Sequence, residues 1–189
     1  MALTLDDLRT LLDVMGLKYA VFPDRAALLA GFRGLNGSYQ FIIHLELNGT
    51  FLQFRSLHLL HCPSDNPHVG AVLRLLAELN YRHRLVKFGW DSSDGEIVAY
   101  ADLWVMDNTV TRAQLERMIH NLLPTVDLSY PRIQATINTG QDPGEASLAD
   151  VIQRAAGTLP SPIRRILEKL IGRKSGEPER TEQPEIVEL

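Results

Sequence analysis

A turn signal between two strand-like stretches constrains the fold of this chain more than any other feature. The turn is Asp91-Ser-Ser-Asp-Gly95, and it interrupts the segment 80–108. Aspartate and serine favour turns through local side-chain hydrogen bonds, and glycine adopts positive φ without strain. The segment therefore predicts two long strands joined as a hairpin. A hairpin alone is only marginally stable in water, so other strands and a layer of helices must complete it.

Two helices are predicted before this hairpin. Thr4 predicts the N-cap of the first, which carries leucines at helical spacing and ends at Gly16. Asn66 and Pro67 predict the N-cap and first position of the second, whose apolar stripe runs to residue 79. The sequence thus places one helix near the start of the chain and another directly before the hairpin.

A third helix is predicted after the hairpin. The run Thr111-Arg-Ala-Gln114 resembles a capping box, and apolar residues follow it at helical spacing. Pro124 is expected to kink or end this helix, because proline has no backbone N–H to donate. Residues 126–137 could form a second helical piece, but Pro131 within them leaves this assignment open.

The remaining strands are predicted between the first and second helices. Residues 18–22 and 27–32 are short strand candidates, although residues 24–29 could equally start a helix. The segments 39–47 and 50–60 flank Asn48-Gly49, a dipeptide typical of a two-residue type I′ turn. Such short turns join antiparallel neighbours. The sequence therefore predicts an α+β fold, in which an antiparallel sheet of about five strands has a helix before, between and after the strand groups.

Composition indicates one domain followed by an extension. With 189 residues, of which 45% are hydrophobic, the chain can bury one substantial core. A glycine- and proline-containing run over 138–147 predicts a linker, so we expect the domain over 1–140. Residues 141–174 are expected to form a linker and helical extension, with a short helix capped by Ser147 and an amphipathic helix over 161–174. Residues 175–189 are polar and acidic, and are expected to be disordered.

The charge of the chain is concentrated at its C-terminal end. Five glutamates and one arginine in residues 175–189 account for the whole formal net charge of −4. The rest of the chain has no net charge, which argues against a dedicated nucleic-acid-binding protein. The single cysteine, Cys62, excludes an internal disulfide, and no stretch has the length and composition of a signal peptide or membrane span. We therefore expect a cytoplasmic protein without membrane insertion.

Metal and catalytic motifs do not form a consistent site. Zinc requires convergent ligands, and the candidates at residues 58 and 61 would point to opposite faces of a strand. Residues 90–96 do not match the register of a calcium loop, and the glycines at 31, 34 and 37 precede a strand rather than a helix. No Gly-x-Ser-x-Gly motif occurs. We expect no enzyme, no metal and no cofactor, with a hydrolase of unfamiliar motif left open. The zinc-type ligands considered are His58, His61, Cys62 and His68.

A family resemblance rests on residues from the second helix to the third. They are Leu79-Asn80, Lys87-Phe88-Gly89-Trp90, Asp94-Gly95-Glu96-Ile97, Asp102-Leu103, Thr111, Gln114-Leu115, Val126-Asp127 and Tyr130-Pro131. With these residues the chain resembles the YbjN domain family over about residues 3–137, a family of bacterial proteins with the type III secretion chaperone-like fold. The resemblance implies a small, dimeric α+β protein that binds another protein as a chaperone, adaptor or regulator. It supplies no catalytic residues.

Two surfaces are candidates for binding a client protein. Large aromatic side chains dominate interface energies, so aromatic residues of the hairpin and of the preceding strands are candidate anchors, although each could instead belong to the core. These anchors are Phe54, Trp90, Tyr100 and Trp104. The basic residues of the 161–174 helix could dock into a partner, pack on their own domain or lie on a membrane. They include Arg164, Arg165 and Lys169.

The strand predicted over 81–90 suggests a different partner. It carries basic residues beside aromatic ones, a combination that can bind single-stranded nucleic acid. Side chains alternate between the two faces of a strand, so these residues do not form one basic and aromatic face. The charges gather at one strand end, beside Tyr81, which weakens the nucleic-acid interpretation. The basic residues are Arg82, His83, Arg84 and Lys87. The sequence therefore favours a non-enzymatic, homodimeric adaptor or regulatory factor that binds a client protein, with a nucleic-acid-associated regulator as the alternative.

Overall fold

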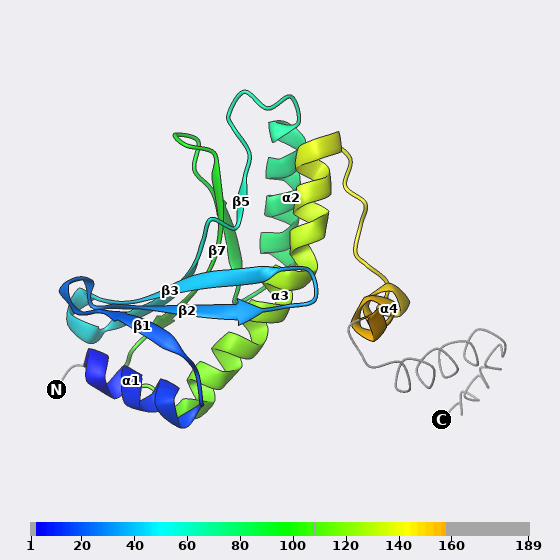
Figure 1. Cartoon of the computed structure of the whole chain (residues 1–189). Coiled ribbons are helices and arrows are strands. Elements are labelled where there is room, and N and C mark those ends of the chain that lie inside the picture. The colour runs from blue at the N-terminus through cyan, green and yellow to red at the C-terminus, as the bar shows by residue number, and fades with distance from the viewer. Residues whose placement is uncertain (1–2, 108, 158–189) are drawn as a thin grey trace, which may run out of the picture. The chain divides into compact units, whose positions relative to one another are not determined.

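The computed structural model describes residues 3–107 and 109–157, and the chain divides into two compact units between Glu145 and Ala146. The described part of the first unit contains the helices α1 (Leu5–Val14), α2 (Val69–Arg82) and α3 (Arg112–Thr139), together with a seven-stranded sheet (Figure 1). The second unit contains α4 (Leu148–Gly157). The predicted 161–174 helix and 175–189 tail lie outside the described residues.

The helix ends follow the predicted capping signals in most places. The Thr4 hydroxyl accepts from the Asp7 N–H at 3.1 Å, and the Asp7 carboxylate accepts from the Thr4 N–H at 3.0 Å, so α1 begins with a capping box. Gly16 follows its end with φ 71°. Thr111 and Gln114 form the same box at α3, and the Ser147 hydroxyl accepts from the Asp150 N–H before α4.

The predicted N-cap of α2 is wrong. Its N-cap is His68 rather than Asn66. The Asn66 side chain accepts from the His68 N–H at 2.7 Å and forms a turn one step before the helix. The predicted cap is therefore two residues early, because the same side-chain geometry suits a turn as well as a cap.

Helix α3 continues through both of its prolines, Pro124 and Pro131, and ends at Thr139, with Gly140 as its C-cap. Figure 1 shows that it changes direction along its length, as expected where proline removes backbone hydrogen bonds. Its second half packs beside α2. None of the described helices is long and apolar enough to span a membrane.

The sheet is antiparallel throughout, with the order β1-β2-β3-β4-β7 and with β6 on the far side of β7. The short strand β5 pairs with the same edge of β7 as β4 does. Because β1 and β2 are both strands, the helical alternative for residues 24–29 is wrong. The strands are β1 (Tyr19–Phe22), β2 (Ala27–Arg33), β3 (Ser38–Glu46), β4 (Phe51–Leu57), β5 (Leu60–His61), β6 (Lys87–Trp90) and β7 (Glu96–Trp104).

The predicted hairpins form, but with different turns and lengths. Between β3 and β4 the chain makes a four-residue connection, with Leu47, Asn48 and Gly49 all at positive φ, instead of a two-residue turn. Strand β6 has four residues because α2 extends to Arg82, so the long strand predicted from residue 80 is wrong. The expected turn before β7 is present, with the Gly95 N–H donating to the Asp91 carbonyl at 2.8 Å.

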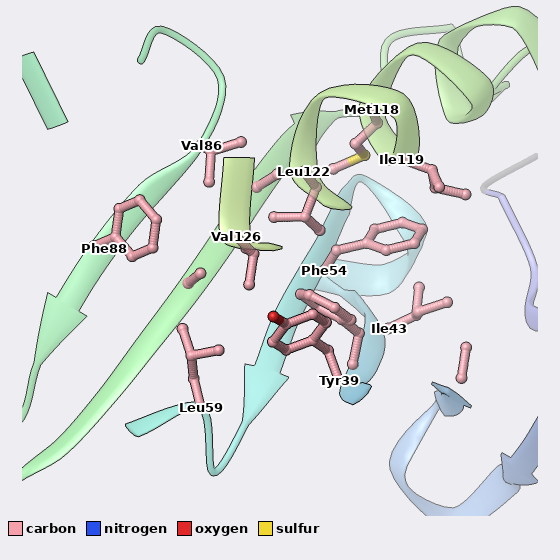
Figure 2. Close-up of a cluster of buried hydrophobic side chains, with 14 of the residues drawn as sticks. Tyr39, Ile43, Phe54, Leu59, Val86, Phe88, Met118, Ile119, Leu122 and Val126 are labelled. Atoms are coloured by element: carbon pink, nitrogen blue, oxygen red, sulfur yellow. The ribbon is translucent and has the colours of Figure 1, made fainter. Parts of the chain in front are cut away.

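The three helices of the first unit cover one face of the sheet, which we call the inner face. Alternate residues of the strands point into this core, where side chains of α3 meet those of β3 and β4 (Figure 2). Phe41 and Phe54 are among the largest fully buried side chains. The α+β class and the helix placement expected from the sequence are therefore confirmed, with seven strands in place of about five.

Candidate functional site

The outer face of the sheet lies opposite the helices, and its side chains form rows across neighbouring strands. The register gives three such rows over β3, β4 and β7, and none of their members belongs to the core cluster. The outer face is therefore a surface separate from the packed core. The rows are Glu46–Phe51–Trp104, His44–Gln53–Asp102 and Ile42–Arg55–Tyr100.

Polar side chains in the middle of the outer face pair with one another. The Gln53 amide donates to Asp102 at 2.8 Å, and Arg55 lies 3.1 Å from Glu96. An open groove of about 400 Å³ adjoins this second pair and is lined in part by Trp90. These four polar groups are paired with one another, so we look for client contacts among the exposed side chains at the end of the face.

Exposed apolar side chains gather at the end of the sheet where β4 begins and β7 ends. We call Leu47, Phe51, Trp104 and Met106 the aromatic corner. Trp104, Met106 and Leu47 are 62%, 72% and 59% exposed. The rings of Phe51 and Trp104 meet edge to face, with centroids 5.1 Å apart. Large aromatic surface held in a fixed arrangement, yet open to solvent, is typical of an interface anchor.

The four aromatic anchors predicted from the sequence have different environments. Trp104 and Tyr100 lie on the outer face, the latter half-buried. Trp90 packs against the core, and its indole N–H donates to the Cys62 carbonyl at 2.8 Å. Phe54 is only 1% exposed, so its assignment to a binding surface is a correction. Alternation along β4 directs Phe54 inward and Phe51 outward, and only the register with β7 shows that Phe51 adjoins Trp104.

The two edges of the sheet differ in their capacity to add a strand. At β6, the Asn80 side chain accepts from the Phe88 N–H at 2.7 Å and donates to the Phe88 carbonyl at 2.9 Å. This closes the edge. At β1 the outward groups follow from the ladder. The Ala26 carbonyl accepts from Leu45 of β3, so the next residue, Ala27, directs its backbone groups toward β1 and pairs with Phe22. Because backbone groups alternate along an antiparallel strand, those of Tyr19 and Val21 point away from β2. Within the described residues no hydrogen bond reaches these outward groups.

The basic residues proposed for nucleic acid do not share one strand. Arg82 ends α2 and pairs with Glu78 at 2.9 Å and also with Glu145. The Lys87 ammonium donates to the Asn80 and His83 carbonyls, both at 2.9 Å. Burial lowers the pKa of His83 below its ordinary value, which favours the neutral ring. Arg82, Lys87 and His83 therefore serve local structure.

The basic residues predicted to bind a partner from the 161–174 helix, Arg164, Arg165 and Lys169, lie outside the described residues.

The candidate zinc ligands are dispersed. His58 has φ 48° and interrupts the strand, so the alternation expected between residues 58 and 61 does not hold. Cys62 is buried, and burial raises the pKa of its thiol. Across residues 3–107 and 109–157, no group of three or more His, Cys, Asp or Glu side chains is placed to hold a metal ion.

Known proteins resemble this chain mainly in fold. No curated protein matches it. The crystal structure of YbjN, a putative transcription regulator from E. coli, has a TM-score of 0.50 and 22% identity, and covers 71% of this chain and 92% of that chain. The ExsC–ExsE complex has a TM-score of 0.49 and 20% identity over 70% of this chain and 97% of that chain. The ExoU–SpcU complex of the Pseudomonas aeruginosa type III secretion system has a TM-score of 0.43 and 22% identity over 65% of this chain and 93% of that chain.

A family model also matches most of the chain. The model for YbjN, described as a putative bacterial sensory transduction regulator, matches residues 4–135. This range begins at the N-cap of α1 and ends inside α3, so it contains the whole sheet, α1, α2 and most of α3. The chain belongs to the YbjN family.

Proposed function

We propose that the chain is a non-enzymatic, chaperone-like adaptor or regulatory factor that binds a segment of a client protein on the outer face of its sheet. The observation that carries this proposal is Trp104, which is 62% exposed and meets the ring of Phe51 edge to face. The two rings already hold each other in an edge-to-face arrangement, so binding would cost little conformational entropy. Most of the free energy gained by burying the rings would therefore stabilise the complex.

The shape of the surface favours a protein segment over a small molecule. Small-molecule sites are usually concave and enclose most of their ligand, whereas the groove on the outer face is open. The free edge at β1 adds a second means of holding an extended segment, by backbone hydrogen bonds. A homodimer in the cytoplasm, expected from the sequence, is part of this proposal. Light scattering of the purified chain would show whether the particle in solution has the mass of a dimer.

Site-specific crosslinking would test where the client binds. A photo-reactive amino acid at position 104 should capture a client in cells, while the same group at position 81 should not. Tyr81 is the matched control because it is aromatic, 91% exposed and on α2. The captured protein would be identified by mass spectrometry and purified.

With the purified client, Trp104→Ala should weaken binding by about 30-fold, the effect of an interface anchor worth about 2 kcal/mol. Tyr81→Ala should leave the affinity unchanged. Urea denaturation should give both variants nearly the wild-type midpoint, because both side chains are largely exposed. Equal crosslinking at positions 104 and 81, or an unchanged affinity of Trp104→Ala, would contradict the proposal.

A further inference from the structure

Three carboxylates border the aromatic corner. Glu46 occupies the same row as Phe51 and Trp104, Asp102 lies two residues before Trp104 on the same face, and Asp107 directly follows Met106. All three are exposed. One amide hydrogen bond, from Gln53, reaches Asp102 and leaves its charge in place. The corner therefore combines apolar surface with negative charge.

Among residues 3–107 and 109–157, no lysine or arginine forms an ion pair with Glu46, Asp102 or Asp107. The two rows that contain Glu46 and Asp102 have no lysine or arginine on β3, β4 or β7. Arg55, one row further on, is paired with Glu96. The turn between β1 and β2 lies at the same end of the sheet and contributes Asp24 and Arg25, which carry no net charge together. The described residues therefore give this corner a negative field, which favours an approaching cation.

The turn at the corner holds an apolar residue in a conformation that costs energy. Leu47 has φ 48°, in the left-handed region, where a non-glycine residue loses roughly 1–2 kcal/mol. Its side chain is 59% exposed, so burial in the core does not offset this cost. Strain retained at an exposed leucine is the kind of outlier that points to a binding function.

We propose that the aromatic corner recognises a client segment in which a lysine or arginine adjoins a large apolar residue. This inference rests on the proposed function and specifies the chemistry of the client. The ring of Trp104 offers a face for a cation. Asp102, two residues before Trp104, and Glu46, on the other side of Phe51, offer acceptors at the same corner. Leu47, Phe51 and Met106 supply contact for the apolar neighbour, so cation and apolar group are recognised together.

Matched synthetic peptides provide the probe. One peptide alternates leucine with lysine, and two others replace every lysine by glutamine or by glutamate. Fluorescence anisotropy of each labelled peptide with the full chain should show the lysine peptide binding at least tenfold more tightly than the glutamine peptide. Raising the salt concentration from 50 to 500 mM should remove most of that preference, since exposed charges are screened.

Variants locate the effect. Glu46→Gln combined with Asp102→Asn should abolish the preference for lysine and leave the affinity for the glutamine peptide unchanged. The control, Asp65→Asn combined with Glu116→Gln, removes the same charge away from the sheet face and should retain the preference. Trp104→Ala should weaken the binding of both peptides. The amide oxygen that Asp102→Asn introduces can still accept from Gln53, so folding should be preserved.

Three results would overturn the inference: equal binding of the lysine and glutamate peptides, an unchanged preference in the Glu46/Asp102 variant, or loss of self-association in Trp104→Ala with no effect on any peptide. The last would assign the corner to a second copy of the chain. If crosslinking at position 104 captures a client whose affinity ignores Glu46 and Asp102, the proposed function stands and this inference fails. If the peptides bind in a charge-dependent way but no client is captured at position 104, the charge preference of the corner stands and the proposed function fails.

Discussion

Asp127 joins a loop to a helix through a buried carboxylate. It belongs to α3 and is 7% exposed. Its oxygens accept from the N–H groups of Leu35 and Asn36, both at 2.8 Å, and from the Tyr39 hydroxyl at 2.7 Å. Burial, and then the hydrogen bond to Asp127, raise the pKa of Tyr39, so the phenol keeps its proton and donates. Gly34 is required beside it, because a Cβ there would collide with the carboxylate.

Removing this carboxylate should destabilise the fold more than removing one of its donors. Asp127→Ala leaves two backbone N–H groups and a hydroxyl without their acceptor, and should cost about 3 kcal/mol or more. Tyr39→Phe removes a single hydrogen bond and should cost about 1.5 kcal/mol. The midpoints of urea denaturation at equal slope measure both costs. Equal losses in the two variants would show that the loop does not depend on Asp127.

At the scale of elements, the sheet has one closed edge and one short open edge. A side chain of α2, Asn80, bonds both outward groups of Phe88, as a further strand would. Strand β1 has four residues and lies between Lys18 and Pro23, features that limit uncontrolled pairing at an exposed edge. The open edge can therefore accept a partner over a short length only.

Asn80→Ala should open the closed edge. The loss of two hydrogen bonds with the Phe88 backbone should lower the free energy of unfolding by about 1–3 kcal/mol. Hydrogen exchange at the Phe88 amide should become faster, because this N–H loses its acceptor. Asn121→Ala is the control, since the Asn121 side chain bonds only a carbonyl on its own helix. An unchanged exchange rate at Phe88 would contradict this role for Asn80.

At the scale of the whole molecule, a set of ion pairs joins the residues after α3 to the helices of the first unit. Arg132 of α3, with a side chain 7% exposed, donates to Asp142 at 2.6 Å and lies 3.2 Å from Glu78. Arg82 of α2 pairs with Glu145. The residues after α3 are thus held against both helices. We propose that the unit extends to Glu145 rather than to residue 140, the boundary expected from composition.

Two truncations separate these boundaries. A chain that ends at residue 145 should unfold at the same urea concentration as the first unit of the full chain. A chain that ends at residue 140 should lose about 2 kcal/mol or more, because the buried Arg132 keeps Glu78 but loses Asp142. Equal stability of the two truncated chains would show that the ion pairs do not contribute.

The difference between the truncated chains should depend on pH. The Arg132 guanidinium lowers the pKa of Asp142 below its ordinary value of 3.8. On acidification the unfolded chain therefore binds this proton first. The stabilisation should be complete above the ordinary carboxyl pKa and should disappear as the pH falls through the lowered one. Urea midpoints measured from pH 6 downward would check this, and a constant difference would exclude Asp142 as the cause.

Local sequence by itself determined the features that short-range hydrogen bonds create. Thr4 and Thr111 start helices because each hydroxyl reaches an N–H three residues away. Gly95 makes the turn before β7 because it adopts φ 77°. These interactions need no other part of the chain, so the α+β class, the helix order and the hairpins could be predicted from the sequence.

Only the tertiary structure decided which side chains are exposed and which meet. Phe51 and Phe54 are equally aromatic, and the register of β4 sends one to the surface and the other to the core. Asn80 bonds Phe88 because the chain folds back after α2. Glu46, Phe51 and Trp104 become neighbours only when β7 lies beside β4. Contacts between distant segments depend on packing and register, and local propensity carries no information about them.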